Sequence, residues 1–162
     1  MTPETYNWLR VGHILGFVLW VGGLVTVLQL LRVHGMVEGA ARDVLGRAER
    51  KAAVLMDLGA TLALVCGFWM AFGGTVNAFK TGGWLHIKLT IVLVGILAVH
   101  GFARVKVKKF RKGEVKPIPA ALTYVVLVAA AAAITLGANR DLLRKNPEVP
   151  AAPAPATTEP AK

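Results

Sequence analysis

Four long apolar stretches alternate with shorter polar segments along the chain. They run from Val11 to Leu31, from Ala52 to about Gly73, from Trp84 to about Val105 and from Ile118 to Ala138. Each has roughly the 20 residues that a helix needs to cross a membrane, because a helix rises about 1.5 Å per residue and the hydrocarbon layer is roughly 30 Å thick. The pattern predicts an all-α integral membrane protein, a bundle of four transmembrane helices.

These stretches divide the chain into one domain with two short ends. We expect an external N-terminus at residues 1–10, a transmembrane domain at residues 11–140 and a disordered tail, rich in Pro and Ala, at residues 141–162. The composition, with 55% hydrophobic residues and a mean hydropathy of +0.56, is too apolar for one small soluble core. The helices are expected at about residues 9–32, 52–74, 84–106 and 118–139.

The net charge of +10 is concentrated in two polar segments, which follow the first and the third apolar stretch. The segment between the second and third stretches has only Lys80. Because Lys and Arg favour the cytoplasmic side, we expect both basic loops inside and both chain ends outside. Topology then accounts for the charge, and no nucleic-acid partner is expected.

Ionisable side chains inside the apolar stretches are the strongest functional signal, since each costs a few kcal/mol unless it snorkels, pairs or binds something. The third stretch carries His86, Lys88, His100 and Arg104, and the second carries Asp57. His100 follows His86 by fourteen residues, which at about 100° per residue predicts that both lie on nearly the same helix face. Asp57 is expected to pair with His100 or Arg104, as a structural ion pair or as part of a proton path.

Two histidines near the outer end of the bundle suit a haem. His13 and His86 both lie within about a turn of the outer ends of their helices, and neutral imidazole nitrogens ligate haem iron. Trp20 lies on the same stripe of the first helix as His13 and would wall a flat macrocycle. The hypothesis is one haem, with His13 and His86 as iron ligands. The alternative is that both histidines lie among lipid headgroups.

Two other basic side chains have plainer interpretations. Lys88 lies about 200° round the helix from His86, so the two do not serve one ligand from the same face, and a lysine here is expected to snorkel outward. His34, beside Arg32 after the first apolar stretch, is expected to be a solvated loop residue.

Three segments in this order match a known pattern. The first is His13-Ile-Leu-Gly-Phe-Val-Leu-Trp-Val-Gly-Gly23, the second is Gly83-Trp-Leu-His-Ile-Lys-Leu89, and the third is His100-Gly101 before a basic loop ending at Glu114. Over about residues 6–138 the chain resembles the HemJ-type protoporphyrinogen oxidases. The first segment alone also resembles the copper-resistance D type of membrane protein.

The resemblance implies a four-helix inner-membrane protein with haem b that converts protoporphyrinogen IX to protoporphyrin IX in haem biosynthesis. It implies a six-electron dehydrogenation with quinone or another membrane molecule as acceptor. Carried over by motif, His13 becomes a haem ligand, and Trp84, His86 and Lys88 become a functional cluster, with Trp84 and Lys88 as catalytic residues. A second copy of the chain or other haem-pathway enzymes are expected partners, besides the lipid bilayer.

The chain departs from the family pattern at four places. The family usually has an Arg and a Tyr-His pair near the end of the first helix, where this chain has Gln29 and Val33-His34. It usually has a Pro early in the second helix, where this chain has Leu58, and Asn-Glu-x-Pro before the fourth, where this chain has Lys116-Pro-Ile-Pro119. A membrane electron-transfer or metal-handling protein, and a non-catalytic membrane protein, are therefore kept as alternatives.

Overall fold

The computed structural model describes residues 1–73, 79 and 83–139. In this part of the chain all regular structure is helical: α1 (Pro3–His34), α2 (Ala40–Gly73), α3 (Trp84–Ile91), the π-helix η1 (Val92–Leu97), α4 (Ala98–Arg111) and α5 (Ala121–Ala138). The segment α3–η1–α4 is continuous and forms one long helix. The expected tail at 141–162 and most of the loop after α2 lie outside the described residues.

Among the described residues, four helical segments are long and apolar enough to cross a membrane: α1, α2, the continuous segment from Trp84 to Arg111, and α5. The prediction of an all-α bundle with four transmembrane helices is therefore confirmed. Three of these segments extend beyond their apolar stretches: α1, α2 and the segment from Trp84 to Arg111. The helix α2 begins at Ala40, ahead of the apolar stretch that starts at Ala52, because the charged segment before Ala52 also adopts helical structure.

The helices α1 and α2 pack along most of their length through small residues. A Cβ atom on Gly16 would lie 2.5 Å from the backbone nitrogen of Ala63, and one on Gly59 would overlap the backbone at Trp20. A Cβ on Gly23 would lie 2.9 Å from the backbone of Met56. Backbone contact of this kind is how helices associate in membranes, and it holds one face of α1 firmly against α2.

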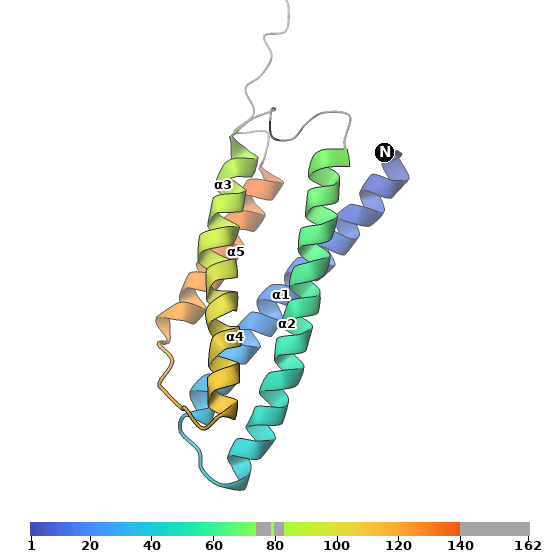
Figure 1. Ribbon diagram of the computed structural model, residues 1–162. Helices are drawn as coiled ribbons and strands as arrows, with labels where there is room; N and C mark the ends of the chain where they lie inside the picture. Colours follow the sequence, from blue (N-terminus) through green and yellow to red (C-terminus); the bar gives the residue numbers. More distant parts are fainter. Residues whose placement is uncertain (74–78, 80–82, 140–162) are drawn as a thin grey trace, which may run out of the picture.

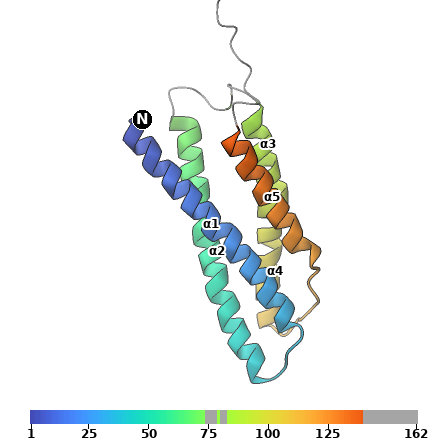
Figure 2. The ribbon, with the colours of Figure 1, turned by 180° about the vertical axis from the view of Figure 1, so that it is seen from behind.

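The remaining helices form the other side of the bundle. Figure 1 and Figure 2 show α3 beside α5 at the end of the bundle where the chain starts, and α4 beside α1 and α2 at the opposite end. The loops after α1 and α4 lie together at that opposite end, which we call the basic end because the chain on either side of these loops is rich in Lys and Arg. Both basic loops are thus on one side, as expected, and the cytoplasmic location of that side stays a prediction.

His34 corrects one expectation, since it is not a solvated loop residue. Its side chain is 6% exposed, its Nδ1 atom lies 2.7 Å from Oε1 of Glu49, and its ring packs edge-on against Phe110 of α4. The reason is the extra length of both helices: α1 continues to His34, and the early start of α2 places Glu49 beside it. Three helices are joined by this contact at the basic end.

A second correction concerns His86 and His100, which do not share a helix face. The π-helix η1 lies between them, and its i to i+5 hydrogen bonds give each residue less rotation than the 100° of an α-helix. His86 is exposed and contacts Phe79, whereas His100 is half-buried and contacts Trp20. The extra residues per turn rotate His100 toward the interior of the bundle.

Candidate functional site

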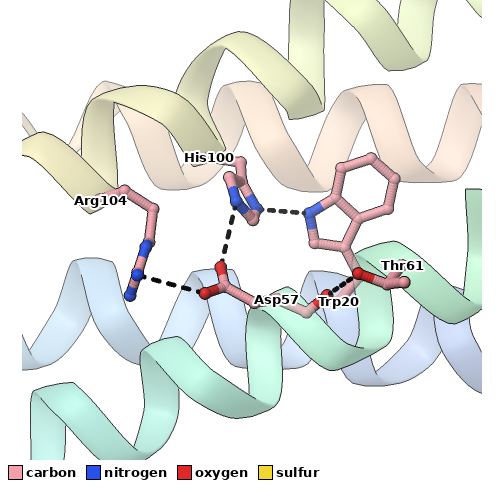
Figure 3. Close-up of polar contacts among 5 residues, drawn as sticks. All are labelled: Trp20, Asp57, Thr61, His100 and Arg104. Carbon is pink, nitrogen blue, oxygen red and sulfur yellow. Dashed lines mark hydrogen bonds and ion pairs between the residues drawn. The ribbon is translucent and has the colours of Figure 1, made fainter.

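A polar cluster joins three helices inside the bundle (Figure 3). Trp20 of α1 is 1% exposed, and its indole Nε1–H donates a hydrogen bond of 3.0 Å to Nδ1 of His100 in α4. An imidazole nitrogen that accepts a hydrogen bond carries no proton, so the proton of neutral His100 is on Nε2. The tautomer of His100 is therefore assigned by its contact with Trp20.

The other side of His100 faces Asp57 of α2. The His100 Nε2 atom lies 3.3 Å from Asp57 Oδ1, and a guanidinium nitrogen of Arg104 lies 3.3 Å from Asp57 Oδ2. Both expected pairings of Asp57 are thus present. The Oδ1 atom is inaccessible, and its contact with His100 lacks the geometry of a hydrogen bond, so this buried oxygen has none.

Sequence reasoning identified Asp57, His100 and Arg104 as a group but missed the role of Trp20. Trp20 was assigned to the wall of a haem site, and its partner His100 is 80 positions away in the chain. The signal that was available is chemical: a buried tryptophan N–H usually has a hydrogen-bond acceptor, and the polar side chains in the apolar stretches were the possible partners.

His13 lies in the half of the bundle away from the basic end and is held against α2. Its Nδ1 atom is 2.7 Å from the backbone carbonyl oxygen of Ala63, which can only accept, so the Nδ1–H donates and Nε2 keeps a lone pair. Gly67 makes room for the ring, because a Cβ there would lie 2.9 Å from Cε1 of His13. This arrangement, with one ring nitrogen bonded to a carbonyl, is typical of metal-ligating histidines.

Lys88 lies in the same half of the bundle as His13. Its side chain is partly buried, and its Nζ atom faces α5, 3.4 Å from the position of a Cβ on Gly137. It is close enough to His13 for the two groups to interact electrostatically. Lys88 therefore points into the bundle rather than outward.

His86 lies on the other side of α3, as its separation of two residues from Lys88 predicts. Its ring is exposed and packs edge-on against Phe79, with the ring centroids 5.8 Å apart, and Phe79 in turn contacts Phe72 of α2. Trp84 is partly exposed at the start of α3. The structure thus places Lys88 within electrostatic range of His13 and turns His86 toward an aromatic group on α2.

The aromatic group on α2 borders an open, apolar hollow of about 580 Å³ on the exposed surface of that helix, which we call the aromatic cavity. Phe68 and Phe72 stack with their ring centroids 6.2 Å apart, and Phe72 continues through Phe79 to His86. The cavity is lined by Leu64, Val65, Phe68, Trp69, Phe72 and Gly73.

The chain is similar to a protein named protoporphyrinogen IX oxidase. That relative, from Synechocystis sp. (strain ATCC 27184 / PCC 6803 / Kazusa), is 30% identical over 115 residues, which cover 67% of this chain and 54% of the relative. The chain thus spans about half the length of the curated relative it matches. No family model and no solved structure matches.

The donor atoms near His13 fit a haem. His13 offers an Nε2 lone pair, oriented by the Ala63 carbonyl, and Lys88 offers a nitrogen inside the same part of the bundle. His86, the second ligand expected from the sequence, faces Phe79, so His13 and His86 point to different neighbours. The assignment of His86 as an iron ligand stays a prediction, as does that of Trp20 as a wall of the haem site.

Proposed function

We propose that this protein is a membrane oxidase of the HemJ type, which converts protoporphyrinogen IX to protoporphyrin IX and passes the electrons through haem b to a membrane acceptor such as quinone. The observation that carries the proposal is the similarity to the Synechocystis protein of that name. The orientation of His13 is consistent with it, because an oriented histidine nitrogen is a common ligand of haem iron.

In this proposal the side chains bind and orient, and the redox chemistry belongs to the cofactor. Haem, when bound, supplies reversible one-electron chemistry. His13 would hold the iron through Nε2, because the Ala63 carbonyl accepts the hydrogen bond from Nδ1–H and keeps the ring in place. Lys88 either ligates as a neutral amine or, as an ammonium, pairs with a propionate, and both roles need the inward position that it has.

The aromatic cavity on α2 is the proposed contact for the flat, apolar part of the substrate. Its stacked rings suit a tetrapyrrole, and it extends toward His86 and the beginning of α3, where Trp84 lies. In this proposal the functional cluster implied by the resemblance acts from two sides of one helix, with His86 and Lys88 on opposite sides and Trp84 at the helix start. Lys88 then serves the interior and His86 serves the cavity.

Two measurements on the purified protein test the proposal. An absorption spectrum should show a reducible haem b, and porphyrin fluorescence should increase when protoporphyrinogen IX and a short-chain quinone are added without oxygen. A preparation with haem but without porphyrinogen oxidation would favour the second candidate, a b-type electron-transfer protein. The observation behind that candidate is Lys116-Pro-Ile-Pro119, which stands where the family usually has a glutamate. A preparation with neither signal would contradict both.

A further inference from the structure

The polar cluster of Trp20, Asp57, His100 and Arg104 is separate from the proposed haem ligands. Trp20 follows His13 by seven residues, so it lies about 10 Å farther along α1 toward the basic end. Polar groups at this depth of a membrane protein are costly, and carboxylate and histidine chains in such positions often conduct protons. The question is whether the geometry of this cluster suits proton transfer or only an ion pair.

The two nitrogens of His100 face different surroundings. Nδ1 faces Trp20, which is almost completely buried in the core of the bundle. Nε2 faces Asp57, whose side chain is 37% exposed, and the adjoining Arg104 side chain is 47% exposed. The imidazole therefore connects the dry interior with a partly accessible acid, which a simple ion pair between Asp57 and Arg104 does not require.

Two details show that this contact is specifically built. The π-helix η1 directly precedes α4 and rotates His100 into the bundle, and such segments occur frequently at functional sites. In addition, Asp57 Oδ1 is an inaccessible oxygen without a hydrogen bond, 3.3 Å from the nitrogen that carries the His100 proton. Buried oxygens are usually paired, so an unpaired one beside an N–H group is available to receive a proton.

We propose that His100 and Asp57 transfer protons between the interior of the bundle and its basic end, and that Trp20 is the positioning residue that holds His100 in the required tautomer. The charged groups that face His100 are Asp57 from α2 and Arg104 from α4, while α1 contributes the uncharged Trp20. The inference rests on the proposed function for its source of protons, because dehydrogenation of a porphyrinogen releases protons as well as electrons.

The transfer uses one proton at each step. A proton from the interior binds His100 Nδ1 when the Trp20 N–H moves away, and the ring becomes an imidazolium. The proton on Nε2 then passes to Asp57 Oδ1, which forms a neutral carboxyl group, and Asp57 releases it to water at the basic end. The positive charge of Arg104 favours the return of Asp57 to a carboxylate. Tautomer exchange moves the remaining ring proton back to Nε2, and the Trp20 hydrogen bond forms again.

The first test needs neither substrate nor haem. The full chain is labelled with ¹⁵N at its histidines, placed in lipid bilayers and studied by NMR, with His100→Gln to assign the signal. Wild-type His100 should carry its proton on Nε2, and Trp20→Phe, which keeps a ring but has no N–H, should populate the other tautomer. A wild-type proton on Nδ1, or no change in Trp20→Phe, would overturn the role of Trp20.

The same samples measure transfer itself, as the rate at which the His100 N–H exchanges with water. Asp57→Asn should slow this exchange about 10-fold or more, because the variant lacks the carboxylate that accepts the proton from His100. Thr61→Val is the matched control, because the Thr61 hydroxyl bonds to the backbone of its own helix at Asp57 O. If Asp57→Asn does not accumulate, Asp57→Glu serves instead, since it moves the carboxylate but keeps its charge. Unchanged exchange would overturn the proposal.

The second test connects the cluster to turnover. Asp57→Asn should lower the rate of protoporphyrinogen oxidation by about 10- to 100-fold, and added formate, a small weak acid, should restore part of it. A rate that is normal, or low and not restored, would contradict proton transfer and leave Asp57 as a structural residue. If the wild type itself does not oxidise the substrate, the proposed function fails, and the exchange rate of His100 still decides the proton-transfer site.

Discussion

The contact between His13 and Gly67 allows the haem assignment to be tested without changing a proposed ligand. In Gly67→Ala the new Cβ would lie 2.9 Å from Cε1 and 3.0 Å from Nδ1 of His13, whereas ordinary contacts begin at 3.4 Å. The ring must therefore move away from α2 by at least about 0.5 Å, the difference between 3.4 and 2.9 Å. Because α1 is packed against α2 through glycines, the ring rather than the helix is expected to move.

The shift acts on the hydrogen bond that orients His13. The distance from Nδ1 to the Ala63 carbonyl is 2.7 Å, so a displacement of about 0.5 Å takes it to about 3.2 Å, the long limit for such bonds. Most of its net contribution, about 1 kcal/mol, would be lost. Changes to the groups that orient a metal-ligating histidine lower metal affinity by about 10- to 100-fold, and we expect a loss of haem affinity of this size in Gly67→Ala.

The assay is a haem titration of the purified variant, followed by absorbance of the reduced protein. Gly22→Ala is the control, since a Cβ at Gly22 meets nothing within 4 Å and the position is an exposed helical site. Haem affinity in Gly22→Ala should equal that of the wild type. If Gly67→Ala binds haem as tightly as Gly22→Ala, the Ala63 hydrogen bond does not orient a haem ligand, and the argument for His13 is refuted.

Four further predictions concern other parts of the molecule. In His13→Ala haem binding should be lost while the protein still inserts, because α1 keeps its apolar residues; full haem content in the purified variant would exclude His13 as a ligand. In Lys88→Gln oxidase activity should be mostly lost, with partial recovery in Lys88→Arg, as measured by complementation of a strain that lacks its own enzyme at equal protein level; normal growth with both would mean that Lys88 only anchors the helix. A reporter fused in the loop after Lys106 should lie in the cytoplasm, and a periplasmic signal would invert the orientation. In Glu49→Ala the free energy of unfolding should decrease by about 1–3 kcal/mol, because buried His34 loses its partner. An unchanged melting temperature in this variant would show that the protein does not need the His34–Glu49 pair for stability.

The sequence by itself determined the four membrane-spanning segments, because the number of apolar residues needed to cross a bilayer is a local property of each segment. It also placed the two basic loops on the same side, since successive helices alternate in direction. It identified Asp57, His100 and Arg104 as a group, because ionisable side chains inside apolar stretches need partners and few were available. The separation of Lys88 from His86 likewise follows from the angle between adjacent helical positions.

Only the tertiary structure decided which neighbour each of these side chains meets. Residue spacing gives a face of an ideal helix, but η1 changes the rotation between His86 and His100, and nothing in the apolar sequence of that segment signals a π-helix. The Trp20–His100 hydrogen bond and the His34–Glu49 contact each join different helices. Such contacts depend on how closely the helices pack and on how far they extend. In this protein the glycine contacts between α1 and α2 decide how closely those helices pack. The length of each helix is decided by helical extensions beyond the apolar stretches.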